Sequence, residues 1–315
     1  MAVMGQVPLD EIRAAALRIA DSAIRSPLLR LPAEGIDELW LKLENLQPIG
    51  SFKIRGAGNA LAAAPPDALR HGVSTASAGN MARAVAWHAR RRGLPCSVLV
   101  PDGAPAAKLD PVAALGARII RVPFDEWWRA LEERGHAQLT GYFVHPVADV
   151  AVMAGNGTIG VEIVDELSGV DAVVVPFGGG GLSCGIASAL KALRPQVRVF
   201  AAEVASAAPL SAALAAGRPV RIEHERSWVD GIGSAGMLDE MWPVARELLD
   251  GSIVVSLDET AAALRTLVQR GRVVAEGAGA AAVAAALSGR AGAGRVVAVV
   301  SGGLIEPSVL SRLMG

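Results

Sequence analysis

Apolar and polar positions alternate along this chain in two different rhythms. Short, nearly continuous apolar runs rich in Val and Ile, such as residues 172–176 and 296–300, are typical of strands in a parallel sheet covered on both faces. Longer stretches with apolar positions at helical spacing separate these runs. The alternation predicts an α/β protein with open, mostly parallel sheets and helices on both faces, arranged as two lobes with a cleft between them.

The boundaries follow from the turn residues and caps that flank each run. The predicted strands are residues 38–44, 73–75, 96–100, 118–122, 142–145, 172–176, 197–202, 253–256 and 296–300. The predicted helices are residues 11–24, a helix capped by Ser51 that runs to residue 61, and residues 80–92, 105–115, 125–134, 157–167, 182–193, 259–270 and 278–287. Residues 203–252 show no regular pattern.

Composition narrows the class of protein. Hydrophobic residues make up 52% of the 315 positions and charged residues 19%, which indicates a packed globular chain. Thirty basic and 31 acidic side chains nearly cancel and form no basic block, so nucleic acid is not an expected partner. No apolar run is long enough to span a membrane, and residues 1–8 lack the features of a secretion signal. Two cysteines, Cys96 and Cys184, fit a reducing cytoplasm.

Three strand-to-helix junctions are rich in glycine and serine. They lie at residues 75–80, 176–182 and 301–304, far apart in the sequence. Ligands of open α/β sheets bind outside the carboxyl ends of the strands. The sequence therefore predicts one composite site built from these three junctions.

The second junction contains four consecutive glycines, Gly178, Gly179, Gly180 and Gly181, before a predicted helix. Bare backbone N–H groups at a helix N-terminus form a cradle for phosphate. The run matches neither G-x-G-x-x-G nor a Walker motif. A tight, flexible turn is the alternative, but four glycines after a buried strand are costly in entropy, which favours a phosphate site.

Lys53 is one of only four lysines and follows the loop Gln47-Pro48-Ile49-Gly50. The pattern places it in the first turn of a helix, where a positive charge is disfavoured. A lowered pKa suits a nucleophilic amine. The alternative is an ordinary solvated lysine.

Residues 47–56 resemble the lysine segment of the threonine dehydratase and serine racemase family, which are pyridoxal-phosphate (PLP) enzymes of fold type II. Further segments that resemble the family, in the same order, are residues 77–80, 145–146, 155–162, 178–182, 230–232 and 301–303. The resemblance covers residues 24–303. It implies a tryptophan-synthase-β-like fold with a large PLP-binding domain at 1–70 and 149–315 and a small substrate-loop domain at 71–148.

The resemblance also implies roles for individual residues. Lys53 matches the lysine that holds PLP as a Schiff base and, once freed, takes the Cα proton of the substrate. The implied cofactor site comprises Lys53, Phe52, Asn80, Gly178, Gly179, Gly180, Gly181, Leu182, Glu276 and Ser301. The implied substrate-carboxylate loop comprises Ser77, Ala78, Gly79, Asn80 and Met81, with Ser77 and Ala78 counted beside Lys53 as catalytic positions. For Glu276, a simple helix-start glutamate is an equal interpretation.

By the same resemblance, Ser301 matches the residue that meets the pyridine nitrogen of PLP; a turn-capping serine is the alternative. The resemblance implies that a neutral hydroxyl at this place does not keep the ring protonated, which disfavours a long-lived carbanion and favours loss of a β-substituent. The expected function is the dehydration and deamination of a 3-hydroxy amino acid such as threonine or serine. Ala78, where eukaryotic serine racemases carry serine, argues against racemisation as the main activity. Met81 and Leu304 suggest a substrate larger or less polar than serine.

Other interpretations stay open at this point. They are a serine or threonine racemase, a cysteine-synthase-like β-replacement enzyme, and a non-catalytic protein that binds a phosphate metabolite. Glu203 matches one ligand of a family cation site, but Pro209 stands where a second carboxylate is expected, so we expect no metal. Trp127 and Trp128 are expected to pack a helix rather than bind substrate. A homodimer is expected from the resemblance.

Overall fold

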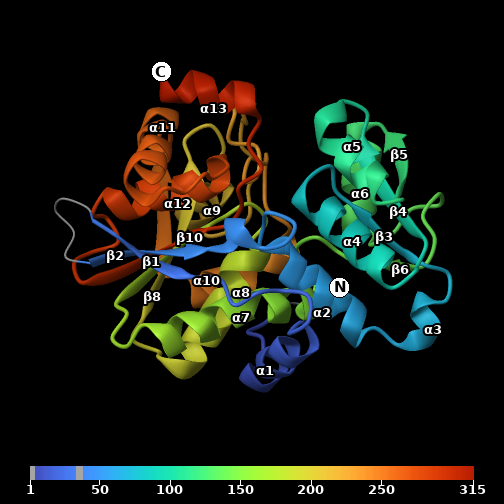
Figure 1. The fold of residues 1–315 in the computed structure, drawn as a ribbon, viewed down its shortest axis with the longest axis horizontal. Coiled ribbons are helices and arrows are strands. Elements are labelled where there is room, and N and C mark those ends of the chain that lie inside the picture. Colours follow the sequence, from blue (N-terminus) through green and yellow to red (C-terminus); the bar gives the residue numbers. More distant parts are fainter. Residues whose placement is uncertain (1–3, 33–37) are drawn as a thin grey trace.

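The computed structural model describes residues 4–32 and 38–315 and consists of two lobes, each built on its own sheet (Figure 1). Within these residues, one sheet has six strands and the other has four. The fold class predicted from the sequence is confirmed, with open sheets and mostly parallel strands. Part of the segment considered for a secretion signal, residues 1–3, lies outside the described residues.

The larger sheet has the strand order β1-β2-β10-β7-β8-β9. Its strands are β1 (Leu28–Leu31), β2 (Glu38–Leu43), β7 (Ala172–Pro176), β8 (Arg198–Val204), β9 (Gly251–Val255) and β10 (Arg295–Val300). All neighbours are parallel except β1 and β2. Because Val300 of β10 pairs with Leu43 of β2, the segment that leads to Lys53 lies beside the turn after Val300.

The smaller sheet is inserted between β2 and β7 of the chain and has the order β5-β4-β3-β6, with parallel strands throughout. Its strands are β3 (Val73–Ala76), β4 (Cys96–Pro101), β5 (Arg118–Val122) and β6 (Tyr142–Phe143). The predicted domain boundaries at 70/71 and 148/149 stay a prediction, and they enclose all four strands.

Helices cover both faces of each sheet (Figure 1). On the large sheet α1, α7, α8 and α10 pack against one face and α11, α12 and α13 against the other; on the small sheet α4 and α6 lie on opposite faces. The helices are α1 (Leu9–Arg18), α2 (Lys53–Ala63), α3 (Pro66–Leu69), α4 (Asn80–Arg91), α5 (Ala106–Ala114), α6 (Phe124–Glu132), α7 (Val150–Glu166), α8 (Gly181–Leu193), α9 (Pro209–Ala216), α10 (Trp242–Leu248), α11 (Leu257–Thr266), α12 (Gly277–Leu287) and α13 (Pro307–Met314). Short 3-10 turns lie at Glu44–Leu46 and Asp239–Met241, and a π-helical turn at Leu267–Gly271.

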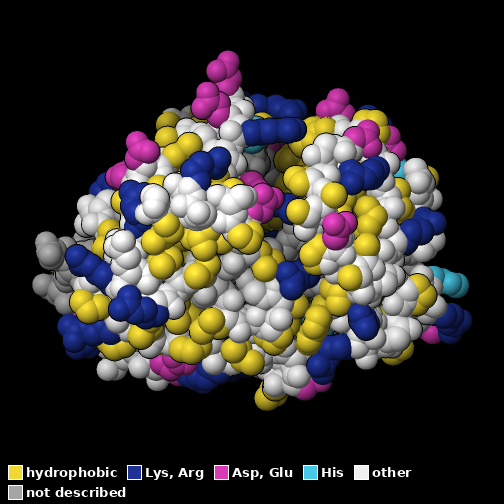
Figure 2. Space-filling model, turned by 45° about the horizontal axis from the view of Figure 1, so that its top comes forward, with side chains coloured by type: hydrophobic (Ala, Val, Ile, Leu, Met, Phe, Trp, Pro, Cys, Tyr) yellow, Lys and Arg dark blue, Asp and Glu magenta, His cyan; other side chains and the backbone are white. Residues whose placement is uncertain are grey.

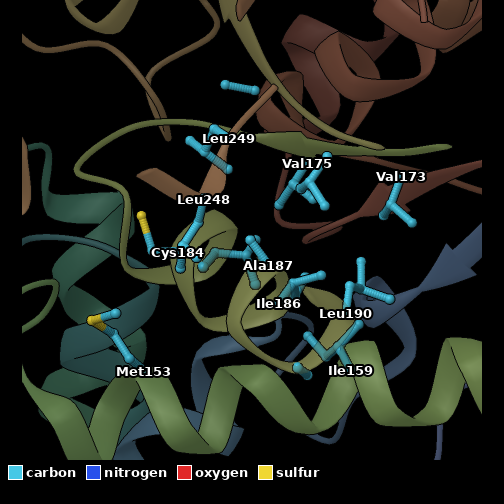
Figure 3. Close-up of a cluster of buried hydrophobic side chains, with 14 of the residues drawn as sticks. Met153, Ile159, Val173, Val175, Cys184, Ile186, Ala187, Leu190, Leu248 and Leu249 are labelled. Carbon is cyan, nitrogen blue, oxygen red and sulfur yellow. The ribbon is translucent and has the colours of Figure 1, made fainter. Parts of the chain in front are cut away.

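The core beneath the large sheet is formed where α7 and α8 meet strand β7 (Figure 3). Ile159, Val175 and Ile186 contribute side chains that are fully buried there. The two helices approach closely because Gly157 of α7 lies against the backbone of Gly185, where an added Cβ would come within 2.8 Å of the carbonyl oxygen. This close packing holds the glycine-rich start of α8 in place.

Helix α7 begins seven residues earlier than the sequence predicted. Asp149 caps it, because its carboxylate accepts hydrogen bonds from the backbone N–H groups of Ala151 and Val152. Gly155 was expected to precede the helix and Gly157 to begin it, since glycine weakens a helix interior. They lie inside it because close contact with α2 and α8 excludes a larger side chain.

Two other predicted helix ends are wrong. Helix α1 ends at Arg18 instead of residue 24, because the side-chain amide of Gln47 binds both the N–H and the carbonyl of Ile24 and holds that residue in a non-helical segment. Ser51 does not cap α2. Its backbone forms a bridge with Gly302 in the large lobe, and the helix starts at Lys53.

Candidate active site

The two lobes face each other across a cleft of about 950 Å³, visible as the hollow between them in Figure 2. All three glycine- and serine-rich junctions contribute to its lining, as the sequence predicted. Every predicted site residue also lines it: Phe52, Lys53, Ser77, Ala78, Gly79, Asn80, Met81, Gly178, Gly179, Gly180, Gly181, Leu182, Glu276 and Ser301. The fold thus brings together residues that are up to 249 positions apart in the sequence.

Lys53 is the first residue of α2, and the turn after β10 fixes its position. The Phe52 N–H donates to the Ser301 carbonyl at 3.0 Å, and the Gly303 N–H donates to the Gly50 carbonyl at 2.9 Å. These two bonds lie on either side of the backbone bridge between Ser51 and Gly302. Together they join the segment that carries Lys53 to the turn that carries Ser301. The Lys53 Nζ donates to the Pro146 carbonyl at 2.8 Å.

The Lys53 amine lies in an environment that disfavours its charge. Burial lowers its pKa to about 8, although the carboxylate of Glu276 acts in the opposite direction. The Phe52 ring lies 5.1 Å from the Nζ atom. An amine with this pKa is partly neutral near neutral pH and can act as a nucleophile or base.

The glycine run forms a backbone cradle in which larger side chains would clash with neighbouring residues. Gly180 has φ +96°, in the left-handed region, and α8 begins at the next residue. A Cβ at Gly179 would lie 2.7 Å from the Val147 side chain, and one at Gly181 would lie 2.7 Å from the Val147 carbonyl oxygen. The first N–H groups of a helix have no partner within the helix, so this end of α8 can hold an anion.

His145 organises the segment between the amine and the cradle. Its Nδ1 atom accepts hydrogen bonds from the N–H groups of Val147 at 3.0 Å and Ala148 at 2.8 Å. Burial lowers the pKa of the imidazole to about 3, so it is neutral. The sequence pointed to His145 and Pro146 only as a segment resembling the family. It gave no sign that Pro146 binds Lys53 or that Val147 limits the glycine cradle.

Asn80 and Glu276 join the two lobes inside the cleft. Asn80, at the start of α4, donates from Nδ2 to the Glu276 carboxylate at 2.9 and 3.2 Å. Burial raises the pKa of Glu276 to about 7, against the lowering effect of this hydrogen bond. A Cβ on Gly302 would come within 2.6 Å of the same carboxylate, so the turn after Ser301 accommodates only glycine beside it.

The loop expected to bind the substrate carboxylate follows β3 and leads into α4. Its Gly79 N–H donates to the Ser77 Oγ at 3.3 Å. Met81 is almost completely buried at the cleft wall, whereas Leu304 on the opposite lobe is 40% exposed. Both residues line the cleft, which fits the apolar pocket expected from them.

The aromatic part of the cleft lining was not expected from the sequence. Trp127 and Trp128 pack against the small-lobe core, as predicted, but both also line the cleft together with Phe124. Periodicity alone could place these rings on a helix, yet it could not show that part of each ring faces a cavity.

A family model described as "Pyridoxal-phosphate dependent enzyme" matches residues 19–302. The chain belongs to this family. It is 40% identical to the L-threonine ammonia-lyase of Thermotoga maritima over 88% of this chain and 70% of that protein. It is 34% identical to the serine racemase of Oryza sativa subsp. indica over 96% of this chain and 92% of that protein.

Solved structures place the chain in the same PLP family. The structure of maize serine racemase matches with a TM-score of 0.87 and 33% identity, over 98% of this chain and 97% of that one. Threonine deaminase isoform 2 from Solanum lycopersicum matches with a TM-score of 0.84 and 29% identity, over 99% and 95% of the two chains. The family resemblance stated from the sequence motifs is confirmed.

The cleft fits the cofactor of this PLP family. A primary amine of lowered pKa suits the cofactor aldehyde, and the glycine-rich start of α8, which lines the same cleft, suits its phosphate. Lys53 and the start of α8 are therefore the groups that would hold PLP. The carboxylate of Glu203, considered above as a metal ligand, instead accepts hydrogen bonds from Leu210 N, Ser211 N and Ser252 Oγ.

No helix within residues 4–32 or 38–315 has the length and apolar character that a membrane crossing requires. Both cysteines are free and buried, and burial raises the pKa of each thiol to about 12. Neither thiol therefore has the properties of a reactive group in this PLP enzyme.

Proposed function

We propose that this PLP enzyme is an ammonia-lyase that converts a 3-hydroxy amino acid, such as threonine or serine, into a 2-oxo acid and ammonia. The observation that carries the proposal is the Lys53 amine, with its pKa near 8, placed in one cleft with a glycine cradle and the Ser77–Asn80 loop. The threonine ammonia-lyases among its relatives support the same reaction.

The residues of the chain divide the work as follows. PLP, when bound, supplies the electron sink at the Cα of the substrate. The backbone N–H groups at the start of α4 would hold the substrate carboxylate. The neutral Lys53 amine would take the Cα proton, since a base with a pKa near the working pH transfers protons efficiently.

Ser301 and Asn80 would tune the cofactor ring. Ser301 lies at the end of β10 in a buried position and offers a hydroxyl, not a carboxylate. With PLP bound, such a neutral partner would not protonate the ring nitrogen, and the site would then favour loss of the β-hydroxyl together with the Cα proton. The family resemblance assigns Asn80 to the ring oxygen, and its bond to Glu276 holds the Asn80 amide at the cleft.

The test measures 2-oxo acid and ammonia release from a panel of 3-hydroxy amino acids, using purified protein supplied with PLP. We expect equimolar release of both products from at least one substrate and none from a Lys53→Ala variant. The variant should keep its circular dichroism spectrum, because Lys53 contributes one hydrogen bond to Pro146 and forms no ion pair within residues 4–32 and 38–315. No product across the whole panel, from a protein that still binds PLP, would refute the lyase.

A serine or threonine racemase is the second candidate, because serine racemases match over nearly the whole chain. Racemisation needs a second group that can move a proton on the face opposite Lys53. Ala78 carries a methyl group in the loop where that group is expected, so we rank this activity lower. Chiral chromatography of recovered substrate separates the two activities, and an Ala78→Ser variant should gain racemisation if the assignment of this position is right.

We also propose that the chain forms a homodimer in the cytoplasm. An apolar groove of about 500 Å³ in the large lobe supports an interface, since it is bordered by the exposed side chains of Leu29, Leu46, Val274 and Leu304. Two free buried cysteines fit a reducing compartment. Sedimentation should give the dimer mass, and a Leu46→Glu variant should shift it toward the monomer; a wild-type monomer at working concentration would refute the dimer.

A further inference from the structure

Three aromatic rings form one wall of the cleft. They belong to Phe124, Trp127 and Trp128, which lie within the first five residues of α6 and pack against one another. Ring centroids lie 5.6 Å apart for Phe124 and Trp127, 6.4 Å for Phe124 and Trp128, and 6.3 Å for the two tryptophans. We call these three residues the aromatic wall.

The position of α6 places this wall at the cleft, on the same lobe as the Ser77–Asn80 loop. Helix α6 starts directly after β5, at the carboxyl edge of the small sheet where the Ser77–Asn80 loop also begins. Just beyond its other end, Arg134 forms an ion pair with Glu240 of the large lobe at 2.8 Å. This pair holds α6 against the large lobe, so the wall borders the cleft and not only the outer surface.

The rings have features of a surface that receives a ligand. Phe124 is 52% exposed although it is a large apolar side chain. The indole N–H of Trp127 is buried, and the described residues offer it no hydrogen-bond partner. The indole N–H of Trp128 donates to Glu132 at 2.8 Å, which fixes the orientation of that ring.

Other large apolar side chains share the cleft lining with the aromatic wall, beside its charged and polar residues. Met81, Met237 and Leu238 line the same cleft, and the two methionines are almost completely buried. Methionine side chains pack well against aromatic rings because the thioether is polarizable. The cleft volume of about 950 Å³ lies at the upper end of the usual range for small-molecule sites, roughly 300–1,000 Å³.

We propose that the preferred substrate carries an aryl or similarly bulky apolar group on its hydroxylated β-carbon, as in 3-phenylserine, and that the aromatic wall binds this group. This inference rests on the proposed lyase function. Offset or edge-on contacts with the three rings supply the selectivity.

The reaction balances for such a substrate. The Cα–H and Cβ–O bonds break, and the proton and hydroxyl leave together as one water molecule. The resulting enamine takes a proton at Cβ, and water then replaces nitrogen at Cα. The products are a 3-aryl-2-oxopropanoate and ammonia, with no oxidant or reductant.

The first experiment compares kcat/KM of the holoenzyme for 3-phenylserine, threonine and serine. We expect 3-phenylserine to exceed both others by about 10-fold or more, the scale of discrimination that a well-filled apolar pocket provides. Turnover of threonine or serine without such a preference overturns this inference and leaves the lyase intact. Absence of turnover for all three refutes the lyase instead.

The second experiment does not depend on turnover. L-Phenylalanine and L-alanine lack a β-hydroxyl group, so they bind without elimination, and changes in the visible absorbance of the cofactor report their dissociation constants. We expect tighter binding of phenylalanine in the wild type and loss of this preference, by about 10-fold, in Trp128→Leu and Phe124→Ser variants. Equal preference in the variants and the wild type overturns the inference even if the lyase itself fails.

A matched control separates the wall from general effects of removing a ring. Trp87 is half-buried in the same lobe, lies under the Arg91 guanidinium at 4.8 Å, and is not part of the cleft lining. The Trp87→Leu variant should keep the wild-type preference for aryl substrates and for phenylalanine. Phe124→Ser guards against misfolding of the Trp128 variant, because the Phe124 ring is more than half exposed.

Discussion

Two cations stand two residues apart at the start of α2, and the protein treats them in opposite ways. Arg55 points into a buried ionic cluster, where its guanidinium binds Glu44 at 2.8 Å and Glu162 at 2.6 Å. Burial alone would lower the pKa of Arg55, but the two carboxylates raise it above its ordinary value. Lys53 points into the cleft, where its one hydrogen bond goes to a neutral carbonyl and its pKa falls to about 8.

The difference separates a structural charge from a chemical group. The cluster around Arg55 extends to Lys42, which is also fully buried and binds Glu162 at 2.7 Å and the Ser26 carbonyl at 2.6 Å. It connects α2 with β2 and α7, the elements that support the large-lobe side of the site. The paired cluster fixes the direction of α2, and the same helix then presents an amine without a close counterion.

The largest effect that we expect from breaking this contrast is on stability. Replacing Arg55 with Met leaves the buried Glu44 carboxylate without its partner and should lower the free energy of unfolding by about 3–5 kcal/mol. Urea denaturation followed by circular dichroism measures the change. The control is Arg25→Met, since Arg25 is half exposed in its pair with Glu166 and should cost less than about 1 kcal/mol. Equal losses in the two variants would contradict a structural role specific to Arg55.

In the cleft, the geometry of the glycine cradle depends on close backbone packing instead of ion pairs. A Gly181→Ala change places a Cβ 2.7 Å from the Val147 carbonyl oxygen and must displace the cradle or the 145–149 segment. We expect PLP affinity to fall about 10- to 100-fold, which equals about 1.4–2.8 kcal/mol. Equilibrium dialysis with PLP measures it. Gly103→Ala is the control, because Gly103 lines the same cleft with open space around it; similar losses in both would count against the cradle.

The sequence located the chemistry better than it located the supports. Lys53 and the four glycines were identifiable because their function depends on local backbone, a helix start and a bare turn. The sequence did not show that Ser51 would join a strand end 251 residues away, or that Asn80 would bind Glu276 across the cleft. Such contacts depend on the register between distant strands, which local spacing does not encode.

The dependence on contacts between distant segments also explains the wrong helix ends and why the aromatic wall was not predicted. Glycines inside α7 look like helix breakers until the neighbouring helices are in place, and only then does their small size become necessary. Trp127 and Trp128 were correctly predicted to pack a helix. Their second contact, with the cleft, depends on how the small lobe faces the large one.

The smallest expected effect is a change in the pKa of Lys53, the property that distinguishes it from Arg55. Glu276 raises the pKa of Lys53 while burial lowers it to about 8, so a Glu276→Gln variant should lower this pKa further, by up to about one unit. The neutral fraction of the amine at a fixed pH below 8 then increases. In protein freed of PLP, the pH at which Lys53 reacts half-maximally with an amine reagent, read by mass spectrometry, should move downward. Glutamine keeps an oxygen for the Asn80 hydrogen bond, so the two lobes remain joined.

The control is Glu306→Gln, which removes a more exposed carboxylate from the same cleft and should leave the midpoint near 8. If the midpoint instead rises in Glu276→Gln, the pKa of Lys53 is not set by burial acting against the charge of Glu276.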